Sequence, residues 1–160
     1  MADNYLETAM DRIVLMQKAA ITRADGTAPD AFPHPFVKSD AFPYWLNIVG
    51  AMQSDLQSVE SERRDHTIVM RLMLGHITQD YTGAIPDRLN GYIVDVLNYF
   101  NARPTLRRDS SDSQIKWLAP APMGAFIDRM TGIKVEEGGS RVWCDFTLVV
   151  PFVVRLDRVY

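Results

Sequence analysis

The side chains that could carry out chemistry are few and widely spaced in this chain. The three histidines are His34, His66 and His76, and no two of them stand at the spacing that puts metal ligands on one face of a helix. His66 and His76 would lie ~33 Å apart along an extended strand, too far to share an ion, and we expect the histidines to be ordinary surface or rim residues. The one cysteine, Cys144, falls in an alternating apolar segment, where a thiol is buried and inert. We therefore expect no catalytic residue, no cofactor site and no metal site.

Basic residues form two short clusters. Arg63 and Arg64 are adjacent, and Arg103 is followed by Arg107 and Arg108. The net charge of −3 gives no general basic field, and about six phosphate contacts would need a much broader basic surface. Loop charges in contact with solvent are the plain interpretation. In the alternative, Arg103, Arg107 and Arg108 are repeated around the lumen of a ring of copies and form a charged collar for passing DNA.

Length and composition are those of one ordinary globular domain spanning residues 1–160. The chain is 47% hydrophobic and 23% charged. No apolar run approaches the ~20 residues of a membrane-spanning helix, so we expect no membrane partner. The first residues lack the basic and apolar regions of an export signal.

The segment 141–156 gives the strongest structural signal. Every second residue is apolar, which predicts a β-strand with one buried face. At ~3.3 Å per residue, one strand would be ~50 Å long, more than twice the usual length. Either a single long strand buries part of its surface against another subunit, or two shorter strands are separated at Pro151. The apolar residues are Val142, Cys144, Phe146, Leu148, Val150, Phe152, Val154 and Leu156.

The other elements follow from helical or alternating spacing and from proline and glycine positions. We predict helices over 5–20 and 81–102, strands over 42–49, 66–78 and 125–130, a strand start at 115–118 and a hairpin tip at 136–139. Extended loops are predicted at 22–41, which is rich in proline, and at 50–65, which is polar and resembles an exposed flap. The fold class is α+β, with a two-layer arrangement of about four mainly antiparallel strands packed against two helices.

This layout resembles the tail terminator, or tail completion, proteins of long-tailed bacteriophages. The shared features are an N-terminal helix at 5–20, a proline and aromatic segment leading into a strand at 32–49, and a polar flap before a second strand at 63–78. A central helix ends in an Asn-x-x-Pro-x-Leu stretch at 101–106, and a hairpin with a glycine-rich acidic tip follows at 131–146. The tail at 149–160 has no counterpart in this pattern.

The resemblance implies a virion structural protein without catalytic residues, assembled in the host cytoplasm. Copies would form a homo-oligomer, expected to be a hexameric ring, at the head-proximal end of the tail tube. The ring would stop tube growth and present the docking surface for the head connector. Its partners would be the tail tube protein and a head-connector or neck protein, with genomic DNA passing through the lumen without sequence recognition.

Candidate interface residues follow from this implied assembly and from exposed aromatic or polar segments. They are Phe32, Phe36, Gln53, Arg63, Arg64 and Trp143. An alternative role is another neck component, such as a head-completion or head–tail joining protein. A third is a small oligomeric enzyme or ligand-binding domain, with a pocket lined by Tyr44, Trp45, Trp117 and Trp143.

Overall fold

The computed structural model describes residues 4–39, 41–76, 84–120, 123–138 and 140–157, with only the backbone described for 84–87. It is an α+β fold with two helices and one mostly antiparallel sheet. The elements are α1 (Tyr5–Ala20), β1 (Asp30–Phe32), β2 (Tyr44–Leu56), β3 (Ser61–His76), α2 (Ala84–Asn101), β4 (Phe126–Met130), β5 (Lys134–Val135) and β6 (Arg141–Arg155). The predicted class is confirmed.

The prediction of about four strands is wrong, because the sheet formed by the described residues has six. The order is β1-β2-β3-β6-β4, and β5 pairs with β6. The additional strands β1 and β5 contain three and two residues, too few to show alternation in the sequence. In the other direction, the strand start predicted at 115–118 contributes only an isolated bridge between Leu118 and Phe152.

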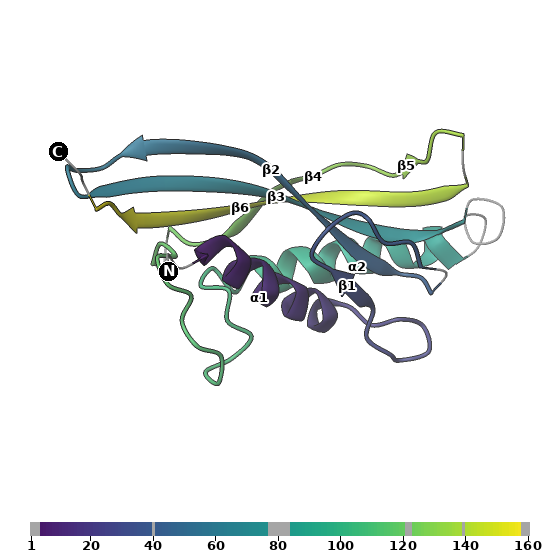
Figure 1. Cartoon of the computed structure of the whole chain (residues 1–160). Helices are drawn as coiled ribbons and strands as arrows, with labels where there is room; N and C mark the ends of the chain where they lie inside the picture. The colour runs from purple at the N-terminus through teal and green to yellow at the C-terminus, as the bar shows by residue number, and fades with distance from the viewer. Residues whose placement is uncertain (1–3, 40, 77–83, 121–122, 139, 158–160) are drawn as a thin grey trace.

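Both helices lie on one face of the sheet (Figure 1). Helix α1 matches its predicted bounds, and the Asn4 side chain caps it by accepting a hydrogen bond from the Glu7 amide at 3.0 Å. Helix α2 occupies 84–101 of the predicted 81–102, and residues 81–83 lie outside the described part of the chain.

The main core lies between these helices and the sheet. Helix α1 contributes Ala9, Met10, Ile13 and Met16, and α2 contributes Val96 and Phe100. The sheet contributes alternate residues of its central strands, including Trp45, Ile68, Met70, Leu72, Cys144, Phe146 and Leu148. This alternation is the periodicity seen in the sequence.

Strand β6 is continuous through Pro151. The prediction of one long strand is therefore confirmed, and the alternative of two strands separated at Pro151 is wrong. The Pro151 carbonyl accepts a hydrogen bond from the Ala119 amide at 2.9 Å. Backbone groups of successive residues point to alternate sides of an antiparallel strand. Residue 151 therefore directs its backbone away from β3, where its missing N–H removes no hydrogen bond from the β3–β6 ladder.

The loop predicted at 50–65 is mostly strand. β2 continues to Leu56 and β3 begins at Ser61, so only 57–60 connect them. Polar composition concealed these strands, because their stability comes from the backbone pairing of 61–65 with both β2 and β6. The loop predicted at 22–41 also contains a strand, since β1 pairs in parallel with Tyr44–Leu46 of β2.

Candidate assembly surface

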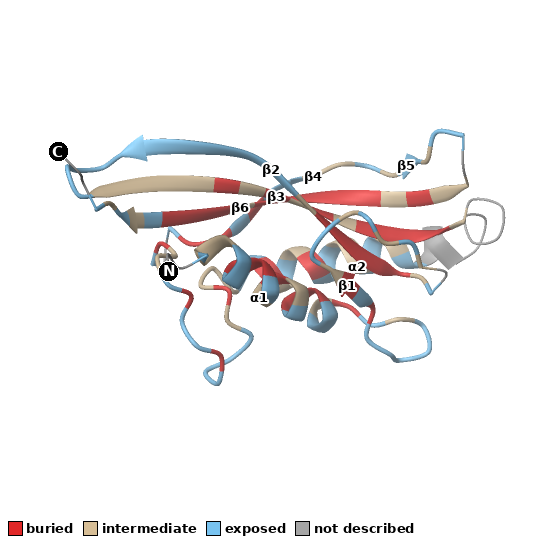
Figure 2. Cartoon of the chain, in the orientation of Figure 1, coloured by how far each residue is buried: buried red, intermediate tan, exposed pale blue. Residues whose placement is uncertain are grey.

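A three-stranded arm projects beyond the helices at one end of the sheet (Figure 1). We define the arm as residues 49–65 of the β2–β3 hairpin together with residues 150–155 of β6. In the central sheet the helices cover one face, but no helix extends over the outer half of the arm (Figure 2). The arm is therefore the least covered part of the sheet.

The outer edge of the arm is β2, and it has no neighbouring strand in the described structure. β1 pairs only as far as Leu46, and all residues from Val49 to Leu56 are exposed. Three of them are large and apolar: Val49 is 51% exposed, Met52 46% and Leu56 60%. An exposed strand edge with apolar side chains is a typical template for pairing with another chain.

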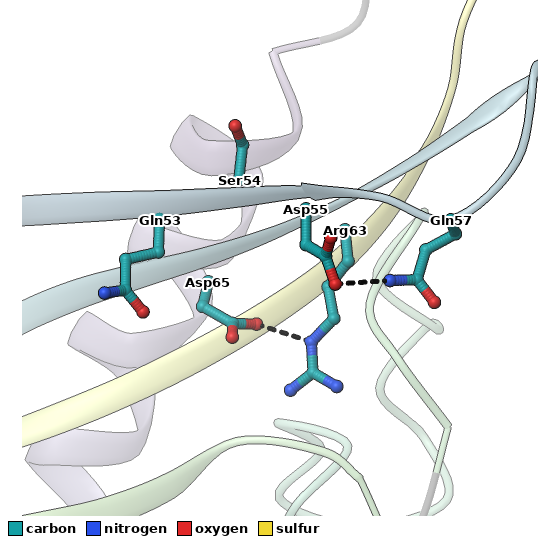
Figure 3. Close-up of a pocket in the computed structure, with 6 residues that line it drawn as sticks. All are labelled: Gln53, Ser54, Asp55, Gln57, Arg63 and Asp65. Carbon is teal, nitrogen blue, oxygen red and sulfur yellow. Dashed lines mark hydrogen bonds and ion pairs between the residues drawn. The ribbon is translucent and has the colours of Figure 1, made fainter.

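Polar residues line a shallow hollow on the face of the arm opposite the helices (Figure 3). Arg63 Nε lies 2.9 Å from Asp65 Oδ1, and Gln57 Nε2 donates to Asp55 Oδ2 at 3.1 Å. Because the arginine is already paired within the hollow, these residues fit a hydrated surface better than a site for an anionic ligand. Gln53 also lines this face, and Ser54 borders the hollow although its side chain points to the other side of the strand (Figure 3).

The first residue of α1 supports the base of the arm. Tyr5 Oη and His66 Nε2 are 2.9 Å apart, and the Tyr5 ring packs against Phe152 with centroids 4.6 Å apart. Arg64 Nη1 donates to the same hydroxyl at 3.3 Å. His66 is buried, and this burial lowers the pKa of its imidazole. The sequence-based expectation of a surface or rim histidine is therefore wrong for His66.

The proline-rich segment crosses the face of the sheet opposite the helices. Phe32 packs there against Tyr44, and Trp143 packs against the same small cluster. The Arg71 guanidinium lies 4.7 Å from the centroid of the Trp143 ring. Phe36, in contrast, is 87% exposed. Of these aromatic interface candidates, Phe36 alone presents most of its side chain to solvent.

The arginines proposed for a lumen collar are engaged within their own loop. Arg103 stacks on Tyr99, with Cζ 3.9 Å from the ring centroid. Arg107 Nε donates to the Asp112 carbonyl at 2.8 Å, and Arg108 donates from both Nε and Nη2 to the Asp112 carboxylate. These contacts give the three side chains a structural role, and a role in a lumen stays a prediction.

Asp112 is the centre of this loop. It accepts a further bond from the Arg108 amide at 2.8 Å and lies 3.7 Å from Arg12 of α1. The guanidinium of Arg108 and these neighbours hold the pKa of the Asp112 carboxyl well below its usual range. Arg12 also donates to the Leu106 carbonyl at 2.9 Å, which attaches the loop to α1.

The aromatic pocket considered from the sequence does not form. Tyr44 and Trp45 are neighbours on a strand and therefore point to opposite faces, with Trp45 in the main core and Tyr44 in the small cluster. Trp143 lies with Tyr44, whereas Trp117 packs at the edge of the main core.

Within the described residues, no three His, Cys, Asp or Glu side chains gather in a group that could hold a metal ion. Cys144 is buried as predicted, and burial raises the pKa of its thiol to about 12. The described helices include none with both the length and the apolar character needed to cross a bilayer.

No protein-family model and no curated protein sequence shows a significant match to this chain.

Sequence reasoning missed the arm, although a signal for it was present. A strand spanning 141–156 needs hydrogen-bonding partners along its whole length. The strand predicted at 66–78 is too short to supply them, so the polar residues before it were the natural extension. The candidates Gln53, Arg63 and Arg64 do lie in the arm, but as residues of paired strands and not of a loop.

Proposed function

We propose that this protein is a structural subunit of a phage tail that forms a ring at the head-proximal end of the tail tube. The ring, expected to be hexameric, would end tube growth and present a docking surface to the head connector or neck protein. The genome would pass through its lumen without sequence recognition. Subunits of such a ring meet through two different surfaces, head to tail.

The arm is the observation that supports this proposal best. It holds a row of apolar side chains away from the core, and its outer strand lacks a partner. A strand with these properties gains apolar burial and backbone hydrogen bonds when a neighbouring subunit covers it. The arm therefore suits a protein that acts by binding other protein subunits.

The experiment is tube capping observed by negative-stain electron microscopy. Tail tubes are polymerised from the tube protein with and without this protein. We expect the wild type to cap one end of each tube and to stop elongation. Leu56→Lys in the arm should weaken capping, because it replaces an exposed apolar contact by a charge that must be desolvated.

The matched control is Val94→Lys on α2. Val94 is 53% exposed, close to the 60% of Leu56, and lies far from the arm along the chain. Both variants should unfold at the wild-type denaturant concentration. Wild-type protein that neither caps tubes nor assembles on them would refute the proposal, and binding to tail-less heads instead would identify a different neck component.

A further inference from the structure

The open edge of the arm has defined backbone directions. The Gln57 amide donates to the Ser61 carbonyl at 3.0 Å, so the backbone of residue 57 points toward β3. Successive residues alternate in an antiparallel strand, and the β2–β3 register is regular over 52–56. Gln53 and Asp55 therefore also bond to β3. The backbone groups of Met52, Ser54 and Leu56 point outward, into the open edge.

We propose that this edge pairs with the same edge of a second copy, as an antiparallel ladder centred on Ser54. In this register the Ser54 residues of the two copies bond to each other. Met52 of each copy bonds to Leu56 of the other. All three outward-facing residues thus satisfy both their N–H and C=O groups.

The side chains are self-complementary in the same register. Met52 and Leu56 project on the face of the sheet that carries the helices, so each exposed apolar side chain meets another across the twofold axis. Gln53 and Asp55 project on the opposite face. There the Gln53 amide of one copy meets the Asp55 carboxylate of the other, and this pair forms twice.

Other registers fit less well. Centring the ladder on Asp55 places two carboxylates directly opposite each other, which is destabilising. Centring it on Gln53 places Met52 opposite Ser54 and loses the apolar pairs. If one strand shifts by one residue relative to the other, side chains on the helix-side face of one copy lie opposite side chains on the other face of the second copy.

The other edge of the sheet is a poorer partner for β2. In β4, the Ile127 amide already donates to Asn101 Oδ1 at 2.9 Å, so part of that edge is satisfied within the chain. The register of β4 is also interrupted between Ile127 and Arg129. The uninterrupted 52–56 stretch of a second copy matches the open edge better.

This dimer concerns the protein before it joins a tail and goes beyond the proposed function. One strand edge accepts one partner at a time, so the dimer keeps the arm from pairing at random. A subunit that uses its arm in a ring would first leave the dimer. That last consequence rests on the proposed function, whereas the dimer itself does not.

Cysteine crosslinking of the full chain tests the register. Residues of a hydrogen-bonded antiparallel pair have Cα atoms about 5.5 Å apart, within the range that a disulfide bridges. Ser54→Cys should give a covalent dimer under mild oxidation on a non-reducing gel. Gln53→Cys alone should not, but an equal mixture of Gln53→Cys and Asp55→Cys should. The native Cys144 is 1% exposed and gives little background.

The control is Val94→Cys, an exposed thiol on α2. Crosslinking of Ser54→Cys no faster than this control would overturn the proposal, as would equal crosslinking by Gln53→Cys alone. Sedimentation of Ser54→Lys gives a second readout. Two facing lysines should raise the dimer dissociation constant by about tenfold without changing the unfolding midpoint. Absence of tube capping together with normal Ser54→Cys crosslinking would refute the ring but not the dimer. Normal tube capping without this crosslinking would refute the dimer but not the ring.

Discussion

A buried pair of amides joins α1 to β2 and offers a direct test of the packing. Gln17 Nε2 donates to Asn47 Oδ1 at 2.7 Å, and Asn47 Nδ2 donates back to Gln17 Oε1 at 2.9 Å. Asn47 Nδ2 also donates to the Phe32 carbonyl at 2.9 Å, which fixes the end of β1. Both amide side chains are almost completely buried.

Asn47→Leu keeps the number and branching of the side-chain heavy atoms and removes all three bonds. It leaves the donor and the acceptor of Gln17 buried without partners, together with the Phe32 carbonyl. Each such group costs about 1–3 kcal/mol. We therefore expect the free energy of unfolding to fall by about 3 kcal/mol or more, a large part of the stability of a domain of this size.

The double variant Gln17→Leu/Asn47→Leu should be more stable than Asn47→Leu alone. It leaves only the Phe32 carbonyl unpaired, at a cost of about 1–3 kcal/mol. Gln17→Leu alone leaves the Asn47 oxygen and one of the two Asn47 side-chain N–H groups unpaired, and should cost about 2 kcal/mol or more. The double-mutant cycle should therefore give a coupling energy of about 3 kcal/mol or more, because the double variant leaves fewer unpaired groups than the two single variants together.

Urea unfolding of the wild type and the three variants measures this cycle. The slope of the free energy with urea should remain constant, so that midpoints report stability. Additive losses in the double variant would refute the reasoning, since they would mean that the amides do not satisfy each other. A loss below about 1 kcal/mol for Asn47→Leu would show that water reaches Gln17.

Two further predictions concern charge. Phe36→Asp should leave the unfolding midpoint unchanged but weaken tube capping, because Phe36 is 87% exposed. Phe146→Asp should instead unfold the chain, because it places an unpaired charge in the core, and circular dichroism would show the loss of structure. If Phe36→Asp also unfolds the protein, its loop is part of the core. The pKa of Asp112 is depressed in the folded state, so the ionised carboxylate adds to the free energy of unfolding. This contribution is fully present above the pKa of the unfolded chain, about 3.9, and is lost as pH falls below that value. Asp112→Asn should therefore lower stability at neutral pH and flatten the acid-induced fall in the urea midpoint, and parallel curves for the two proteins would contradict this.

The elements that could be read from the sequence are those whose burial repeats along the chain. Helix α1 has an apolar stripe with period 3.6, and its predicted bounds agree with the structure. Strand β6 has an apolar residue at every second position, which predicted the strand but left open whether Pro151 divides it. In both cases a covered face makes the local pattern and the tertiary structure agree.

The β2 edge of the arm could not be read in this way, because residues 49–56 are all exposed. The strands of the arm are set by backbone pairing with a strand distant in sequence, and the side chains of 53–55 carry no alternation. The contacts of the candidate site residues also depend on tertiary structure. Phe32 is partly buried because it packs against the Tyr44 cluster, whereas Phe36 lies outside that cluster. The side chains of Arg103, Arg107 and Arg108 donate to backbone carbonyls and to Asp112.

The composition of the arm edge bears on why it is left open. Soluble proteins protect exposed strand edges with lysine, proline, bulges or short strands. Residues 49–56 contain no lysine and no proline, and Asp55 is their one charge. The irregularity in register lies between Val49 and Met52, which leaves the following stretch straight enough to pair. An edge this long and this poorly protected would promote aggregation of a monomer, so a sequence that keeps it open is best explained by a partner strand. In the ladder centred on Ser54, Asp55 of each copy faces Gln53 of the other. In the ladder centred on Asp55, the two carboxylates would face and repel each other, so this one charge favours the first register over the second.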